Sequence, residues 1–255
     1  MSWNRVGLWT LIKRELIRSM KVINQVVWPP IIMTLLYVFV FGLALGKQLQ
    51  NVQGVSYAEF LIPGLIMLQV IDSSYGECSS SLFQARFMGS IQEMLVAPMS
   101  AAEIVFGYIF GSVVRALVIA GLITIVGLLF VHTYPTDWIL YFGVLIVVSI
   151  LFSALGLIFG LLAEKFDHIA VLTTFVITPL VFVGGVFTSA HALPPFMQKL
   201  ELFNPMFYTI DAFRYSYIGN SFLPLWQSIG AICALAIVCL VVVLRMMSVG
   251  YKLRA

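Results

Sequence analysis

The sequence predicts an all-α polytopic membrane protein with six transmembrane helices, and three observations support this prediction. Of the 255 residues, 61% are hydrophobic and 10% are charged, and the mean hydropathy is +1.04. Soluble domains carry about 25% charge. Several apolar segments reach the length that crosses a bilayer, about 20 residues. The alternation of apolar and polar residues that marks a membrane barrel is absent from these segments.

The composition also excludes several classes of protein. The chain has 14 basic and 11 acidic residues, so its formal net charge is only +3. This balance excludes a disordered charged tail and a nucleic-acid partner, and so few charges cannot coat a soluble domain. The cysteines lie in apolar surroundings without CxxC spacing and are interpreted as reduced packing residues. They are Cys78, Cys233 and Cys239.

Six segments qualify as spans. The second contains Asp72 and Glu77, and the third contains Arg115. The six expected spans are residues 22–46, 60–83, 101–131, 138–163, 169–187 and 222–244.

Six spans place both termini on one side of the membrane. The basic residues expected on that side are Arg5, Lys13, Arg14, Arg18, Lys21, Arg86, Lys165, Arg245, Lys252 and Arg254. Those expected on the other side are Lys47, Lys199 and Arg214. The positive-inside rule therefore predicts that both termini are cytoplasmic.

Residues 5–21, before the first span, are predicted to form an amphipathic helix. At 100° per residue its apolar face gathers Leu8, Trp9, Ile12, Leu16, Ile17 and Met20, and the opposite face carries Arg14, Arg18 and Lys21. Such a helix lies in the membrane interface with its basic face toward headgroups or a partner. Both interpretations stay open, a membrane-surface anchor or a contact with a cytoplasmic partner.

A short helix is expected at residues 89–98, between the second and third spans. Ser90 and Glu93 have the spacing of a capping box, and Pro98 stops the helix. A second capping box, Ser100 with Glu103, starts the third span. The short helix is expected to display Ile91, Met94 and Leu95 beside Gln92 and Glu93. It is either a structured loop against lipid or a helix that docks into a groove of a soluble partner.

Residues 189–221, before the last span, are too polar for a span and rich in aromatic residues. Pro195 lies at the start of one short helix, and Asn204 with Pro205 breaks it. A second short helix is expected at residues 206–217, ending near Gly219. Two short apolar helices after a span indicate a re-entrant hairpin, which is tolerated only where it is buried in protein.

The charges inside the second and third spans cost at least about 2.5 kcal/mol each if they are unpaired at the membrane centre. A rise of about 1.5 Å per residue puts Glu77 and Arg115 at a similar depth. We therefore expect these two to pair, or to share a network with Asp72. The group is either a structural ion pair or the polar lining of a path. The second interpretation is supported by other polar residues of the second span, namely Ser73, Ser74, Tyr75, Ser79, Ser80 and Ser81.

The sequence shows no evident catalytic or metal-binding motif. The histidines, His132, His168 and His191, lie in separate loops without metal-ligand spacing. The glycines Gly107, Gly111, Gly156 and Gly160 form two GxxxG pairs, which allow close helix packing within or between subunits. We predict no catalytic residue, no metal site and no cofactor on this chain. A transporter of this kind takes its energy from a gradient or from another chain.

Several longer motifs carry a family resemblance. They are Thr178-Pro-Leu-Val-Phe-Val-Gly-Gly-Val-Phe187, Leu193-Pro-Pro195, Asn204-Pro205, Asp211-Ala-Phe-Arg214-Tyr215, Phe60-Leu-Ile-Pro-Gly64 and Gly89-Ser-Ile-Gln-Glu-Met-Leu-Val-Ala-Pro98. In this combination the chain resembles the membrane-spanning subunit of ABC-2 type exporters. It is similar to bacterial permeases that export nodulation factors, polysaccharides and drugs.

The resemblance implies a homodimer or close heterodimer in the bacterial inner membrane, with two cytoplasmic ABC ATPase subunits that carry ATP and Mg²⁺. It implies that residues 89–98 are a coupling helix, contacting the ATPase through Ser90, Ile91, Gln92, Glu93, Met94 and Leu95. It also implies that residues 5–21 are an interface helix, with Arg14, Arg18 and Lys21 toward the ATPase. The implied external gate comprises Phe182, Phe187, Pro194, Pro195, Asn204, Pro205 and Arg214.

The functional hypothesis is ATP-driven export of a lipid, a lipid-linked glycan or a drug, along a path lined by the first, second and fifth spans. The main alternative is a gradient-driven transporter or ion channel that uses Asp72, Glu77 and Arg115 as a relay. A membrane-embedded enzyme lacks a nucleophile or metal cluster here. A membrane scaffold would use the same docking helix and need no polar path.

Overall fold

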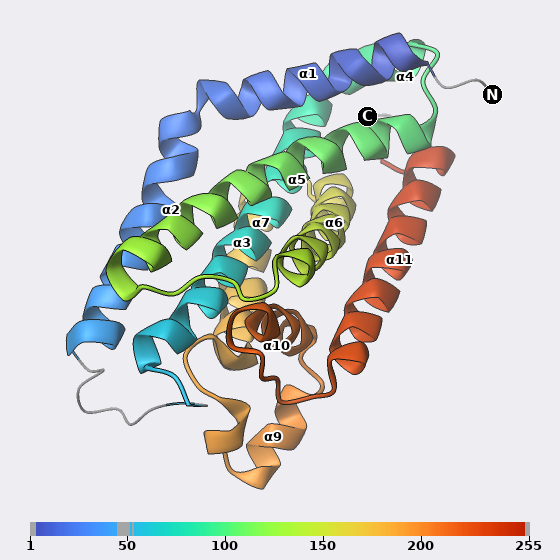
Figure 1. Cartoon of the computed structure of the whole chain (residues 1–255). Coiled ribbons are helices and arrows are strands. Elements are labelled where there is room, and N and C mark those ends of the chain that lie inside the picture. The colour runs from blue at the N-terminus through green and yellow to red at the C-terminus, as the bar shows by residue number, and fades with distance from the viewer. Residues whose placement is uncertain (1–3, 45–51, 53, 253–255) are drawn as a thin grey trace.

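The computed structural model describes residues 4–44, 52 and 54–252. Within these ranges the regular elements are helices, apart from one bridge between Val52 and Val55. The helices form an elongated bundle, and the two described ends of the chain lie at the same end of it (Figure 1). We call this the α1 end and the opposite one the α9 end.

The first helix, α1 (Arg5–Lys21), crosses the end of the bundle, as Figure 1 shows. It begins at Asn4, whose side chain accepts a hydrogen bond from the backbone of Gly7. At Val22 the chain turns into α2 (Ile23–Tyr37), which continues as a π-helical segment, Val38–Ala44. The expected bounds of the amphipathic helix agree with α1. The expected end of the first span, at residues 45 and 46, lies outside the described residues.

The central helix is α3 (Tyr57–Phe87), which packs against α5, α6 and α10. It begins after Ser56, whose hydroxyl accepts from the backbone of Glu59, and it extends past both expected ends of the second span. Its extension at the α1 end is stabilised by Arg86. The Arg86 guanidinium donates to the carbonyls of Gly160, Leu161 and Ala163, the groups left free where α6 ends.

Three helices follow α3. The short α4 (Ser90–Val96) is followed by α5 (Ala101–Val126), which continues as a π-helical turn, Gly127–Val131. The predicted capping box at Ser100 and Glu103 is confirmed. At the start of α4, Ser90 is the first helical residue and its hydroxyl donates to Ala85. The next span is α6 (Trp138–Leu162), which agrees with the expected fourth span to within one residue.

The fifth span is irregular. It runs through α7 (Phe166–Leu172), a π-helical stretch Thr173–Ile177, α8 (Thr178–Val181) and a second π-helical stretch Phe182–Val186. Near its end the backbone is kinked at Gly185, whose φ of 97° lies in the region that favours glycine. The kink ends the helix and turns the chain toward the α9 end.

At the α9 end the chain forms α9 (Pro195–Glu201) and α10 (Pro205–Ile218) after a 3-10 turn, Ala190–Ala192. The predicted second short helix is confirmed, and its C-cap is Gly219. The last helix, α11 (Leu225–Val249), is shifted from the expected 222–244. It starts after Pro224 and continues past the apolar run to Val249, with Arg245 and Ser248 exposed and Gly250 as its C-cap.

Both GxxxG pairs pack within the chain. A side chain at Gly156 or Gly160 would meet the α3 backbone, with the Tyr75 carbonyl 2.5 Å from the Cβ position at Gly156. Gly107 and Gly111 lie instead under α1, against Leu11 and Glu15. These glycines therefore bring α6 onto α3, and α1 onto α5.

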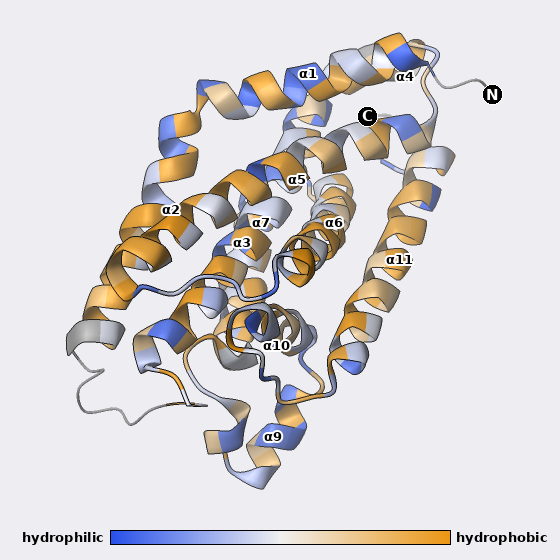
Figure 2. Cartoon of the chain, in the orientation of Figure 1, coloured by the Kyte–Doolittle hydropathy of each residue, from blue (hydrophilic) through white to orange (hydrophobic). Residues whose placement is uncertain are grey.

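Among the residues that the structure describes, five helical segments are long and apolar enough to cross a membrane. They are Ile23–Gly42, Ala101–Val131, Trp138–Leu162, Phe166–Val186 and Leu225–Val249. Figure 2 shows their hydrophobic character, most evenly along α6 and α11, beside the mixed surface of α1. The chain is therefore a multi-pass membrane protein.

Candidate functional site

The α1 end contains a network of buried charges. The Glu77 carboxylate of α3 accepts hydrogen bonds from Arg18 at 2.6 Å and from the Ser19 hydroxyl at 2.8 Å. Its second oxygen pairs with Arg115 of α5. The predicted pair of Glu77 and Arg115 is therefore present in the structure. It is joined by α1, which the sequence interpretation did not connect to these charges.

The second carboxylate of the network is Glu15 of α1, which is almost fully buried. It accepts from Arg14 at 2.8 Å, from Arg18 at 3.3 Å and from the Ser81 hydroxyl at 2.7 Å. The sequence interpretation missed Glu15. Glu15 follows Leu11 by four residues and Ile12 by three, so it lies on the same face of the helix. This spacing is the sequence signal that its carboxylate faces protein.

Arg14 and Arg18 of α1 bind groups of their own chain. Arg14 also donates to the Tyr108 hydroxyl at 3.0 Å, and Arg18 bridges both carboxylates. Burial lowers the pKa of Arg14, but its attraction to Tyr108 and its bond to Glu15 outweigh this and hold the pKa above its ordinary value. Lys21 remains exposed at the end of α1. Arg14 and Arg18 are therefore engaged within the chain and remain partly exposed.

The polar residues of α3 divide between two faces. Asp72 is exposed and lies near enough to Arg115 for their charges to attract. Tyr75 lies on the other face, fully buried, with its ring 6.3 Å from that of Phe159 in α6. The prediction that Tyr75 lines a path is therefore wrong. Its ring packs against α6 instead of facing an opening.

The short helix α4 buries the residues that were expected to be displayed. Ile91 and Met94 pack into the core under α1 and α5. The prediction that they project toward a partner is wrong for this structure, because the helix turns its apolar face to its own chain. The side chains of Glu93 and Leu95 lie outside the described part. Exposed apolar side chains occur instead at Phe87, Met88 and Val96, with Gln92 beside them.

Aromatic side chains gather where the fifth span ends. The ring of Phe187 lies 5.0 Å from that of Phe182, and 5.3 Å from those of both Tyr37 and Phe41. Phe182 and Phe187 were expected here from the sequence. The sequence interpretation missed Tyr37 and Phe41, because they come from the first span.

The kinked end of the fifth span is held by three polar side chains. The Asn204 amide donates to the Leu180 carbonyl at 2.6 Å, and Tyr57 donates to the Phe187 carbonyl at 2.8 Å. The buried Arg214 donates to the Gly185 carbonyl at 2.5 Å and lies 3.8 Å from the ring centre of Phe60. These donors satisfy carbonyls that the broken helix cannot pair. The prolines predicted for this region each start or precede a helix. They are Pro194, Pro195 and Pro205.

One acid at the α9 end is buried without a described hydrogen-bond partner. Both carboxylate oxygens of Glu201, the last residue of α9, lack one among the described residues. Burial and the nearby Asp211 raise the pKa of Glu201 to about 7, although Arg214 opposes this. The described residues hold no group of three His, Cys, Asp or Glu able to bind a metal ion.

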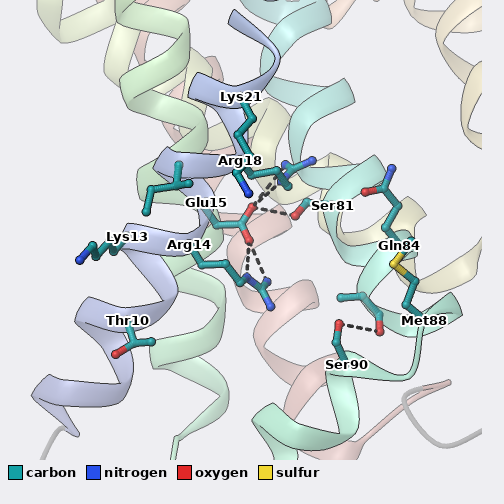
Figure 3. Close-up of a pocket in the computed structure, with 12 residues that line it drawn as sticks. Thr10, Lys13, Arg14, Glu15, Arg18, Lys21, Ser81, Gln84, Met88 and Ser90 are labelled. Carbon is teal, nitrogen blue, oxygen red and sulfur yellow. Dashed lines mark hydrogen bonds and ion pairs between the residues drawn. The ribbon is translucent and has the colours of Figure 1, made fainter.

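A cavity of about 530 Å³ opens between α1 and the end of α3. Figure 3 shows Arg14 and Arg18 reaching from α1 toward Ser81 of α3, with Lys21 at one end of the cavity. The residues that line it are Thr10, Lys13, Arg14, Glu15, Ile17, Arg18, Lys21, Ser81, Gln84, Ala85, Met88 and Ser90.

Comparison with known proteins gives the family. Residues 6–218 match the family of membrane proteins described as ABC-2 type transporter. The chain is 39% identical, over 227 residues and 89% of both chains, to the inner membrane transport permease YadH of Escherichia coli. It is 27% identical to nodulation protein J of Rhizobium meliloti, over 92% of this chain and 89% of that one. It is 26% identical to nodulation protein J of Neorhizobium galegae, over 78% and 76%. The chain belongs to the ABC-2 type transporter family of membrane permeases.

Proposed function

We propose that this chain is the membrane-spanning subunit of an ATP-driven exporter in the bacterial inner membrane. Two copies form the permease, and two cytoplasmic ABC ATPases supply energy from ATP and Mg²⁺. The substrate is a hydrophobic or amphipathic molecule such as a lipid, a lipid-linked glycan or a drug. The α1 end and both termini face the cytoplasm.

One observation carries the proposal, a stripe of exposed or half-exposed residues along α3. It comprises Gln69, Asp72, Ser73, Gly76 and Ser80. Between Phe60 and Phe83 the other residues of α3 are buried. The spacing of three and four residues puts the stripe on one helix face. A charged face cannot rest against lipid without a large cost. We infer that the stripe faces a polar path between two copies of the chain.

This proposal makes α3 the sixth span. Its 31 residues extend about 46 Å at 1.5 Å per residue, more than the roughly 30 Å of hydrocarbon in a bilayer. It runs along the bundle between the α9 end and the α1 end (Figure 1). With the five apolar spans it gives an even number of crossings, which agrees with two described chain ends at one end of the bundle.

The charge network suits a role in coupling. Glu15 and Glu77, with the arginines that bind them, tie α1 to both α3 and α5. A push on the interface helix α1 therefore moves two spans together rather than sliding over them. In this account, ATP binding closes the ATPases, α1 transmits the motion, and the two copies rock to open the path outward.

The ATPase contact proposed here differs from the one expected from the sequence. Phe87, Met88 and Val96 are exposed apolar residues at the α1 end, where α4 connects two spans. Apolar side chains that become buried when two proteins bind, surrounded by a polar rim, form the centre of stable protein interfaces. We therefore assign these residues, with Gln92, to the ATPase surface in place of Ile91 and Met94.

The proposal is tested by purifying the tagged chain gently from native membranes and identifying its partners by mass spectrometry. The variant carries Phe87→Asp with Val96→Asp, and the control carries Phe196→Asp with Phe203→Asp. These four side chains are between 73% and 87% exposed, and the control pair lies in or beside α9. We expect an ATP-binding subunit to accompany the unchanged chain and the control, and to be lost from the variant. A chain that purifies without any such subunit, and still moves ions in liposomes, contradicts the proposal.

The rival function, an ion relay through Asp72, Glu77 and Arg115, has less support. A relay acid needs an oxygen that is free to take a proton. Glu77 already accepts from Arg18, Ser19 and Arg115. The rival predicts transport that depends on the proton gradient and needs no ATPase.

A further inference from the structure

We propose that the cavity between α1 and α3 binds the phosphate group of an anionic membrane lipid. The inference concerns a site that the transport account does not require. Figure 3 shows the charged side chains that line this cavity. Four of the lining residues are cations, Lys13, Arg14, Arg18 and Lys21, and one is an acid, Glu15.

The acid does not cancel these cations at the cavity surface. One Glu15 oxygen is bound by Arg14 and the other by Arg18 and Ser81, and the side chain is only 3% exposed. Glu77 is also bound within the protein, by Arg18 and Arg115. Counting Arg115, these two acids and Asp72, which lies near Arg115, five cations face three carboxylates, an excess of two positive charges. The cavity therefore presents a positive surface to a ligand.

The geometry of the donors suits a phosphate. The side chains of Arg14 and Arg18 remain 40% and 30% exposed although they are bound to acids. An arginine fork can serve a second anion through its remaining N–H groups. The lysines add mobile ammonium groups on long stems, which bind phosphate as point charges. Hydroxyl and amide groups of Thr10, Gln84 and Ser90 line the same cavity. Its volume of about 530 Å³ falls within the roughly 300–1,000 Å³ of ligand pockets.

The surroundings favour a lipid over a soluble phosphate. The exposed apolar side chains of α1 include Trp9, Ile17 and Met20, and Trp28 lies exposed on the adjoining α2. Apolar and aromatic side chains on a helix across the end of a membrane bundle lie at headgroup depth. Ile17 also lines the cavity, so that an acyl chain can leave it along the exposed apolar side chains of α1. A phosphate at this depth belongs to a lipid of the cytoplasmic leaflet.

The test measures lipid retained by the full chain, with the partners that accompany it, by native mass spectrometry. The probes are phosphatidylglycerol, phosphatidylcholine and inorganic phosphate, each titrated separately. The variant carries Lys13→Gln with Lys21→Gln, which leaves the buried network intact. The control carries Lys165→Gln with Arg245→Gln, an equal loss of exposed positive charge elsewhere on the chain.

We expect phosphatidylglycerol to bind the unchanged chain and the control, and to bind the variant about 30-fold more weakly, since each surface cation contributes about a fivefold effect. Equal binding of phosphatidylglycerol by variant and control overturns the proposal. Equal binding of phosphatidylcholine and phosphatidylglycerol overturns it as well. Inorganic phosphate that binds as tightly as the lipid overturns the assignment to a membrane ligand. A variant that loses the ATPase but keeps the lipid reassigns the lysines to a protein contact. Because lipid binding is measured without transport, failure here leaves the exporter proposal standing.

Discussion

The two faces of α3 contrast sharply. Toward α6 the helix is packed backbone to backbone, with Gly156 against the Tyr75 carbonyl and the buried Tyr75 ring against Phe159. On a different face Asp72 and Gly76 belong to a stripe that this chain leaves uncovered. The comparison teaches that polarity alone does not mark a path. Some polar residues of a span serve its own packing, and only the uncovered ones are available to a partner or a substrate.

The largest loss of stability should come from a substitution of Glu77, which follows Gly76 in α3 and neutralises Arg18 and Arg115. We expect Glu77→Ala to destabilise the protein by about 3 kcal/mol, because it leaves the partly buried Arg115 without its ion-pair partner and Arg18 with Glu15 alone. Thermal unfolding in detergent measures this. Arg115→Met added to Glu77→Ala should recover part of the loss. If Glu77→Ala alone is as stable as the unchanged chain, the charge network does not stabilise the fold.

A smaller loss is expected on the packed face. The Gly156→Ala change puts a methyl group against the α3 backbone, and overpacking of this kind costs about 1–3 kcal/mol. The matched control is Gly143→Ala, also in α6, where nothing lies within 4 Å of the added carbon. We expect the control to gain slightly, since alanine favours a helix over glycine by about 1 kcal/mol. Equal unfolding temperatures for the two variants would contradict the close approach.

Glu201 sharpens the contrast with Glu77, because it is a buried acid without a described hydrogen-bond partner. Its pKa is raised to about 7, whereas in an unfolded chain a glutamate titrates near 4.3. The protonated form therefore favours the folded state. Its contribution is fully present below about pH 4 and is lost as the pH rises through about 7. Unfolding followed between pH 5 and 8 should show a loss on the order of 2 kcal/mol that Glu201→Gln removes. A pH profile that is the same in both proteins would exclude this role.

The smallest effect on stability is expected at the open face. Asp72→Asn should change the free energy of unfolding by no more than about 0.5 kcal/mol, as for other exposed positions. The comparison with Glu77→Ala in the same detergent is the informative one. An Asp72→Asn protein that unfolds as readily as Glu77→Ala would place Asp72 in the structural network and remove it from the path.

Much of the helix order was predictable from the sequence, because its signals are local. The basic and apolar faces predicted α1, and Ser100 with Glu103 predicted the start of α5. The family was also recognisable, from motifs that run through most of the chain. The five apolar spans followed from composition.

The tertiary partners were harder to predict. An apolar face on α4 does not say whether it turns to a partner or to its own chain, and Ile91 turns inward. The partners of Glu15 come from other helices, since Ser81 of α3 lies 66 residues away along the chain. The π-helical segments of the first and fifth spans have no sequence rule, and the bonds of Tyr57 and Asn204 depend on them.

The central claim is that the open face of α3 lines a path between two copies, and cysteine labelling in native membranes tests it most directly. Gly76→Cys puts a thiol on this face, and Gly143→Cys puts one on an exposed part of α6, with the unsubstituted chain as the blank. We predict that Gly76→Cys reacts with a water-soluble maleimide and cross-links to its copy through a short bifunctional reagent, whereas Gly143→Cys does neither. Labelling of Gly143→Cys alone, or of both to the same extent, would contradict the account.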